Sequence, residues 1–154
     1  MVRRKIAVTG LDHFIADLAM RTGHKELATW AADCAERVLP YFESRHPGDD
    51  RPRMAIRALR EWVRTGTFRM ADVRRASLAA HAAARDVKED DAARSAARAA
   101  GQAMATSHVP AHAIAAARYA ATAVRDAAPP GNADEAALAE REWQYRHLLR
   151  LAGE

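Results

Sequence analysis

The sequence predicts an all-α fold, a single-domain bundle of about six or seven alanine-rich helices. Alanine, the residue with the highest helix propensity, fills 39 of the 154 positions. Apolar residues recur at three- and four-residue spacings along most of the chain, which is typical of one face of a helix. Trp, Tyr and Phe are rare, with three of each. We therefore expect a core in which small side chains let the helices approach closely and a few aromatic side chains fill the gaps.

The N-terminal part of the chain predicts an arm and two helices. Residues 1–10 are expected to form an arm or tail, because they show a short basic run and no helical spacing. A first helix follows Asp12 and ends at Gly23. A second begins at about His24 and weakens after Pro40, which lacks a backbone donor. The apolar stripe of this second helix contains Leu27, Trp30, Ala31, Cys34 and Val38.

The segment from Arg51 to Gly66 predicts a helix with one apolar and one cationic face. Pro52 lies in its first turn, where the missing N–H costs nothing, and Gly66 ends it. Spacings of four, three and four residues place four guanidinium groups on one stripe, because successive helical residues are about 100° apart. We call this stripe the arginine ridge; it consists of Arg53, Arg57, Arg60 and Arg64.

Four more helices are expected in the rest of the chain. Their ranges are about 70–88, 92–107, 110–126 and 132–150. Acidic residues at 89–91 suit the positive end of the next helix dipole, although continuation of the preceding helix through this alanine-rich region is the alternative. An N-x-x-E pattern at Asn132 predicts a capping box for the last helix. Its apolar face is expected to contain Leu138, Tyr145 and Leu149.

The net charge of +4 is unevenly distributed. Residues 51–100 carry 12 basic and 6 acidic side chains, against 7 and 8 in residues 1–50 and 5 and 6 in residues 101–154. Such an excess suits a basic patch that faces an acidic partner or nucleic acid. The alternative interpretation is a solvated helix face with no partner.

The chain is expected to act as one cytoplasmic domain. Residues 11–154 are enough to bury a real core. Cys34 is the only cysteine, so no intrachain disulfide is possible, and its spacing places it in the core as a small apolar side chain. No apolar run resembles a secretory signal or reaches the 18 residues or so that span a bilayer.

Several polar residues lie beside apolar stripes. They are Asp33, His81, Arg85, His108 and His112. We interpret them as buried polar groups that hydrogen-bond within the alanine-rich core. A metal site built from His81, His108 and His112 is the alternative, because His-x3-His is a known ligand spacing, although Pro110 interrupts the pair. No phosphate-binding loop, zinc motif or nucleophile motif is present, so we predict neither an enzyme, a cofactor nor a bound metal.

The arginine ridge is the clearest candidate for recognition. Guanidinium groups bind carboxylates and phosphates through paired hydrogen bonds, so an acidic protein surface and nucleic acid both suit it. The break at residues 66–70 offers at most a weak imitation of a helix-turn-helix, which leaves DNA binding as an alternative.

Five segments together give the chain a resemblance to a known family. They are Trp30–Pro40, Asp50–Ile56 with Trp62, Ala79–Arg85, Ala99–Ala113 with Tyr119, and Glu142–Gln144. In combination these segments resemble the Imm-5-like family of immunity proteins from bacterial polymorphic toxin systems, over about residues 25–150.

The resemblance implies an all-α protein that binds and neutralises a toxin made by the same or a neighbouring cell. It brings no catalytic or metal-binding residue with it. Our first hypothesis is therefore a cytoplasmic immunity protein that occludes its toxin stoichiometrically through the arginine ridge. Since charge complementarity favours specific association, a toxin with an acidic surface patch fits best. The alternatives are a basic helical module that binds nucleic acid and, less favoured, a metal-dependent helical enzyme.

Overall fold

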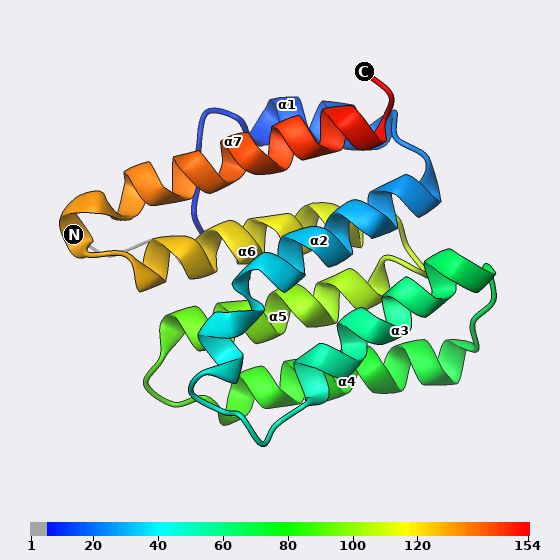
Figure 1. Ribbon diagram of the computed structural model, residues 1–154, viewed down its shortest axis with the longest axis horizontal. Coiled ribbons are helices and arrows are strands. Elements are labelled where there is room, and N and C mark those ends of the chain that lie inside the picture. The colour runs from blue at the N-terminus through cyan, green and yellow to red at the C-terminus, as the bar shows by residue number, and fades with distance from the viewer. Residues whose placement is uncertain (1–5) are drawn as a thin grey trace.

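The computed structural model describes residues 6–154 and shows helices stacked along one long axis (Figure 1). The helices are α1 (Asp12–Met20), α2 (His24–Glu43), α3 (Arg51–Thr65), α4 (Met70–Asp86), α5 (Asp91–Ala105), α6 (His112–Ala127) and α7 (Ala133–Leu151), with a short 3-10 turn at Pro130–Asn132. No strand occurs among residues 6–154, so the prediction of an all-α bundle is confirmed. Within the same residues no helix has both the length and the apolar character needed to cross a membrane.

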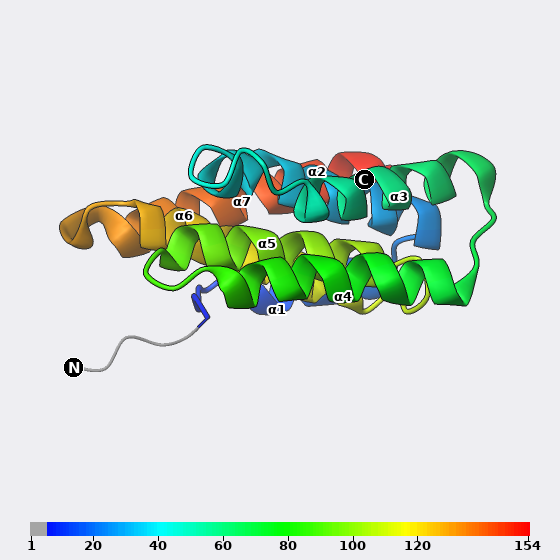
Figure 2. The same cartoon turned by 90° about the horizontal axis from the view of Figure 1, so that it is seen from below.

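The helices form two layers (Figure 2). One layer contains α7, α2 and α3, and the other contains α6, α5 and α4, with α1 beside α6 and α7. Helix α5 lies between α4 and α6 in its own layer and is covered by α2 and α3 from the other layer. The molecule thus has two broad outer faces, one formed by α2, α3 and α7 and the other by α4, α5 and α6.

Alanine makes the close contact between the layers possible. Helix α5 buries seven alanines and Gly101, while α2 supplies the large side chains Trp30 and Phe42. Trp30 is fully buried, and its indole N–H donates to the carbonyl oxygen of Gln144 (2.9 Å). Cys34 is fully buried, as expected, and burial raises the pKa of its thiol well above the usual value. The thiol is therefore a packing group and not a nucleophile.

The predicted helix boundaries hold within a few residues, with two informative differences. Helix α2 continues past Pro40 to Glu43, because Phe42 packs into the core and stabilises the extra turn. Helices α4 and α5 are separate, which rules out the continuous alternative. Val87 is extended, and the Asp90 carboxylate caps α5 by accepting from the Ala93 N–H (2.9 Å).

The prediction for the apolar face of α7 was correct only in part: Tyr145 and Leu149 are half-buried against the core, but Leu138 is not. Leu138 is 40% exposed, and Asn132 makes no side-chain cap. The helix instead buries a stripe with polar members: Ala137, Glu140, Arg141, Gln144 and Leu148. Polar side chains can take these positions because Glu140, Arg141 and Gln144 each have a partner inside the protein.

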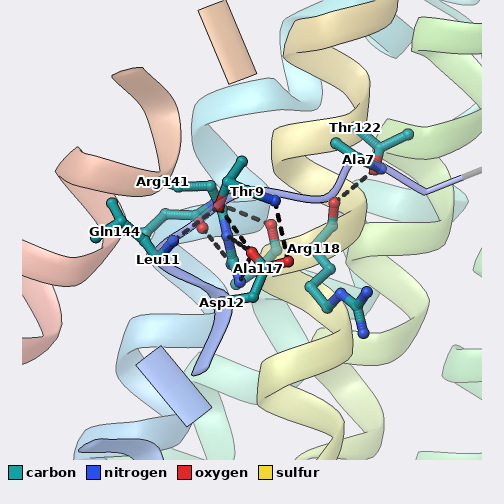
Figure 3. A network of polar contacts seen from close by, with 9 residues as sticks. All are labelled: Ala7, Thr9, Leu11, Asp12, Ala117, Arg118, Thr122, Arg141 and Gln144. Carbon is teal, nitrogen blue, oxygen red and sulfur yellow. Dashed lines mark hydrogen bonds and ion pairs between the residues drawn. The ribbon is translucent and has the colours of Figure 1, made fainter. Parts of the chain in front are cut away.

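A buried polar network joins α7 to α1 and α6 (Figure 3). The guanidinium of Arg141, whose side chain is 2% exposed, donates to Asp12 Oδ1 (3.1 and 3.2 Å) and to Gln144 Oε1 (2.8 Å). The Gln144 amide nitrogen in turn donates to the carbonyl oxygen of Ala117 on α6 (2.9 Å). The buried face of α7 is therefore partly polar, which the apolar spacing in its sequence did not predict.

The described part of the predicted N-terminal arm packs on α6. Ala7 is buried, and its N–H donates to Thr122 Oγ1 (3.0 Å). Thr9 donates through its N–H and its hydroxyl to the two carboxylate oxygens of Asp12 (3.1 and 2.8 Å). The rest of the predicted arm, residues 1–5, lies outside the described residues.

Candidate functional site

The arginine ridge lies on α3, but its four side chains fall into two different environments. Arg53 and Arg60 are seven residues apart and point toward α2. Arg57 and Arg64, also seven residues apart, are exposed to solvent. Only half of the predicted ridge therefore faces outward without a neighbouring helix.

Carboxylates of α2 pair with the inner half of the ridge. Arg53 binds Glu43 with two hydrogen bonds (2.7 and 3.1 Å) and also reaches Glu36 (3.2 Å). These hydrogen bonds from Arg53 lower the pKa of Glu43 against the opposing effect of burial. Arg60 lies 2.9 Å from Asp33 and 3.3 Å from Glu36. The positive charge of Arg53 and Arg60 is thus largely balanced inside the protein.

The outer half of the ridge is less constrained. Arg64 pairs with Glu61 on its own helix, and both side chains are mostly exposed. Arg57 makes no direct ion pair among residues 6–154, although it lies close enough to Glu43 to lower the pKa of that carboxyl. An exposed pair such as Arg64–Glu61 opens readily, since it contributes little net stability. Arg57 and Arg64 are accordingly available to an incoming partner.

A shallow groove beside the ridge is lined by α2 and α7. Its volume is about 330 Å³, and its walls are Asp33, Glu36, Arg37, Trp143 and His147. The half-buried Trp143 lies between two side chains: the Arg37 guanidinium is 3.8 Å from the ring centroid, and the His147 ring stacks at 4.9 Å. An aromatic ring flanked in this way combines a cation–π contact with ring stacking.

Hydrogen bonds hold the groove side chains in fixed positions. Arg37 binds the buried Glu140 with two hydrogen bonds (2.8 and 2.9 Å). Arg150 donates to His147 Nδ1 (2.8 Å), and His147 Nε2 donates to Asp33 Oδ2 (2.7 Å). Because a guanidinium only donates, this arrangement places the ring proton of neutral His147 on Nε2. Asp33 therefore connects the groove to Arg60 of the ridge.

The five polar residues predicted as buried are not buried. Arg85 and His108 are exposed, while Asp33, His81 and His112 are half-buried. They lie at the edges of apolar stripes, where one side of a helix meets solvent, so helical spacing alone overestimated their burial. The buried polar side chains of the protein are others, among them Glu140, Arg141 and Gln144. The i, i+1, i+4 spacing of these three residues fits one face of a helix, but their polar character gave no sign that this face is buried.

Two histidines of the alternative metal site, His81 and His112, have other partners, and the third, His108, is exposed. His81 Nδ1 accepts from Arg98, and His112 bonds Gln102. No group of three or more metal-ligating side chains comes together within residues 6–154.

The fold and the surface define a class of protein: a small all-α protein with clusters of charged side chains on its two outer faces. Residues 17–151 match the family described as Imm-5 like putative immunity protein, and the chain belongs to that family. No curated protein and no solved structure matches the chain.

Proposed function

We propose that this protein binds a toxin in the cytoplasm and neutralises it by stoichiometric occlusion through the outer face of α2, α3 and α7. One observation carries the proposal: Trp143 lies half-buried in a groove whose rim is built of charged side chains, beside the arginine ridge. Interface residues that dominate binding energy are most often Trp, Tyr and Arg. Membership of an immunity-protein family supports the same conclusion.

The internal ion pairs favour binding because they fix the side chains in advance. Arg53 and Arg60 are held by α2, and Arg37 is held by Glu140. Ordering a long side chain on association costs about 0.5–1.5 kcal/mol, a cost largely avoided when the side chain is already held. Arg57 and Arg64 then supply the positive charge for an acidic patch on the toxin.

The same ion pairs argue against nucleic acid on this face. A phosphate backbone that approached Arg53 and Arg60 would also meet Asp33, Glu36 and Glu43. Repulsion from these carboxylates offsets the attraction that phosphate binding requires. The nucleic-acid alternative is therefore less favoured at the ridge than a protein partner.

Substitutions on the α2–α3–α7 face test the proposal. The chain is co-expressed with toxin domains encoded beside its gene, and cell survival and complex affinity are measured. Arg57→Glu/Arg64→Glu and Trp143→Ala are each expected to lower affinity at least about tenfold and to abolish rescue, while the thermal unfolding midpoint stays close to that of the wild type.

Arg74→Glu/Arg85→Glu is the matched control. It makes the same change in charge on exposed positions of α4, in the other layer. This variant is expected to rescue cells like the wild type. If the ridge variant also rescues fully, the α2–α3–α7 face is not the toxin-binding surface.

A further inference from the structure

The outer face of α4, α5 and α6 carries positive charge that no carboxylate balances. The chain has no acidic residue between Asp72 and Asp86, nor between Asp91 and Asp126. Those two stretches form most of the three helices on this face. Arg85 on α4 and Arg98 on α5 make no ion pair with any carboxylate among residues 6–154. This face therefore differs from the ridge, whose inner arginines are paired.

His81 lies at the centre of this charge. Arg98 Nη1 on α5 donates to His81 Nδ1 on α4 (3.2 Å). The ring lies so close to α5 that a Cβ atom on Gly101 would be 2.7 Å from His81 Nε2. Since Arg98 can only donate, Nδ1 must be unprotonated, and the neutral ring carries its proton on Nε2.

Two more side chains complete the group. His112 Nδ1, at the start of α6, lies 2.7 Å from Gln102 Oε1 and donates to it, because an amide oxygen only accepts. Gln102 follows Arg98 by one turn of α5, and Arg85 follows His81 by one turn of α4. We call this group the cationic cluster: His81, Arg85, Arg98, Gln102 and His112.

The electrostatic effects on His81 come from cations. Burial lowers the pKa of His81 below its ordinary value of 6.5. The charged groups that face the ring lower it further: Arg98 on α5, Arg85 on its own helix and His112 on α6. In the absence of an anion, protonation of His81 would add another positive charge and break its hydrogen bond from Arg98.

We infer that the cationic cluster binds the phosphate group of a small molecule. Guanidinium and imidazolium groups are the usual protein partners of phosphate oxygens. The donors come from three helices, an arrangement that suits a tetrahedral anion better than a planar carboxylate with two oxygens. A bound phosphate also neutralises Arg85 and Arg98 together, which no carboxylate of residues 6–154 does. This site lies on the opposite layer from the proposed toxin face and does not depend on toxin binding.

The direct experiment follows the imidazole signals of His81 and His112 by NMR at constant ionic strength. Inorganic phosphate, AMP and adenosine are titrated separately. Phosphate and AMP are expected to shift both imidazoles in a saturable way, and adenosine to leave them unchanged. Tighter binding of AMP than of phosphate would identify a nucleotide as the preferred source, and equal affinities would identify free phosphate. Absence of saturable shifts with both anions would overturn the inference.

Variants distinguish a specific phosphate site from nonspecific attraction of phosphate to a basic protein. Arg85→Gln and Arg98→Gln are each expected to lower phosphate affinity about tenfold, as expected for loss of a charge-assisted hydrogen bond. Arg57→Gln on α3 removes the same charge from the other layer and is expected to leave the affinity unchanged. Equal losses in all three variants would mean that only net charge matters. If a variant fails to fold, the NMR titration of the wild-type protein still tests whether phosphate binds.

Proton uptake gives a second readout. An anion next to His81 favours the imidazolium form, so binding should strengthen as the pH falls from about 7.5 to about 5.5. Sulfate is the suitable probe because its charge is constant over this range. The increase should disappear in His81→Gln/His112→Gln. A pH-independent sulfate affinity in the wild type would contradict the role of the imidazoles.

Discussion

Among single residues, Arg141 is the one whose surroundings matter most for stability. It is a buried cation that depends on Asp12 for its countercharge. Asp12→Asn is expected to lower the free energy of unfolding by about 3 kcal/mol, because removing one partner leaves the other charge buried and uncompensated. Urea denaturation measures the loss. Asp17→Asn, on an exposed position of the same helix, is the control and should change stability by less than about 0.5 kcal/mol.

The Asp12 carboxylate also limits the stability of the folded protein at low pH. Burial opposes ionisation of Asp12, but hydrogen bonds from Thr9 and the charge of Arg141 outweigh it and hold the pKa below the ordinary value of 3.8. A carboxyl whose pKa is lower in the folded state stabilises the protein above its unfolded pKa and loses that effect as the pH falls through its folded pKa. Wild-type stability should therefore fall below about pH 4.

Comparison with Asp12→Asn isolates this contribution. Other carboxyls with lowered pKa values, such as Glu43 and Asp49, titrate in both proteins. Urea midpoints between about pH 6 and pH 2 should decline less steeply in the variant than in the wild type. Parallel declines would show that Asp12 does not carry the acid sensitivity.

Residue-level features were the hardest to predict from the sequence. The arginine ridge was identified as a stripe, but whether a guanidinium faces solvent or a carboxylate depends on which helix packs beside it. Arg53 and Arg57 look equivalent in the sequence, yet only Arg53 meets Glu43 directly. The burial of Arg141 was also invisible, since its partner Asp12 lies 129 residues away.

At the scale of elements, local signals sufficed for nearly every boundary. Gly66 adopts the left-handed conformation that ends α3 (φ 73°), and Asp90 caps α5. Local signals failed where tertiary contacts override them. Helix α2 was expected to weaken after Pro40, but burial of Phe42 stabilises its last turn. Contacts between distant helices are absent from a local pattern, so such an exception cannot be read from it.

The contact between α4 and α5 depends on Gly101. In an open helix, Gly→Ala stabilises by about 1 kcal/mol. Here the added methyl group would collide with the His81 ring, so Gly101→Ala should be neutral or destabilising in the wild-type background. In a His81→Ala background, where the obstacle is gone, the same change should stabilise by about 1 kcal/mol.

A double-mutant cycle of chemical denaturation measures this coupling. Gly10→Ala, at an exposed glycine with open space around it, is the control whose effect should be the same in both backgrounds. If Gly101→Ala stabilises both backgrounds equally, the imidazole does not restrict the approach of α5.

For the whole molecule, the two layers explain where the excess charge of residues 51–100 lies. The sequence located the excess in this part of the chain and left two interpretations, a basic patch that faces a partner or a solvated helix face. In the structure, α2 carboxylates offset the inner ridge, while Arg74, Arg85 and Arg98 on α4 and α5 make no ion pair among residues 6–154. The uncompensated charge therefore includes the α4–α5–α6 face, on the layer opposite the groove of Trp143. How the positive charge divides between the two layers depends on how the helices pack, which the amino-acid composition does not encode.

The layers also predict how the molecule opens. Helix α5 is enclosed by α4 and α6 and covered by α2 and α3, so its amides can exchange only when the whole protein unfolds. Helix α1 packs on α7 and α6 alone and is held mainly by the Asp12–Arg141 contact and a few apolar side chains. Native-state hydrogen exchange should give α5 an opening free energy equal to that of global unfolding, and α1 a clearly smaller one. Equal values for α1 and α5 would mean that helices α1 to α7 unfold as one unit and that α1 is held as firmly as the centre of the bundle.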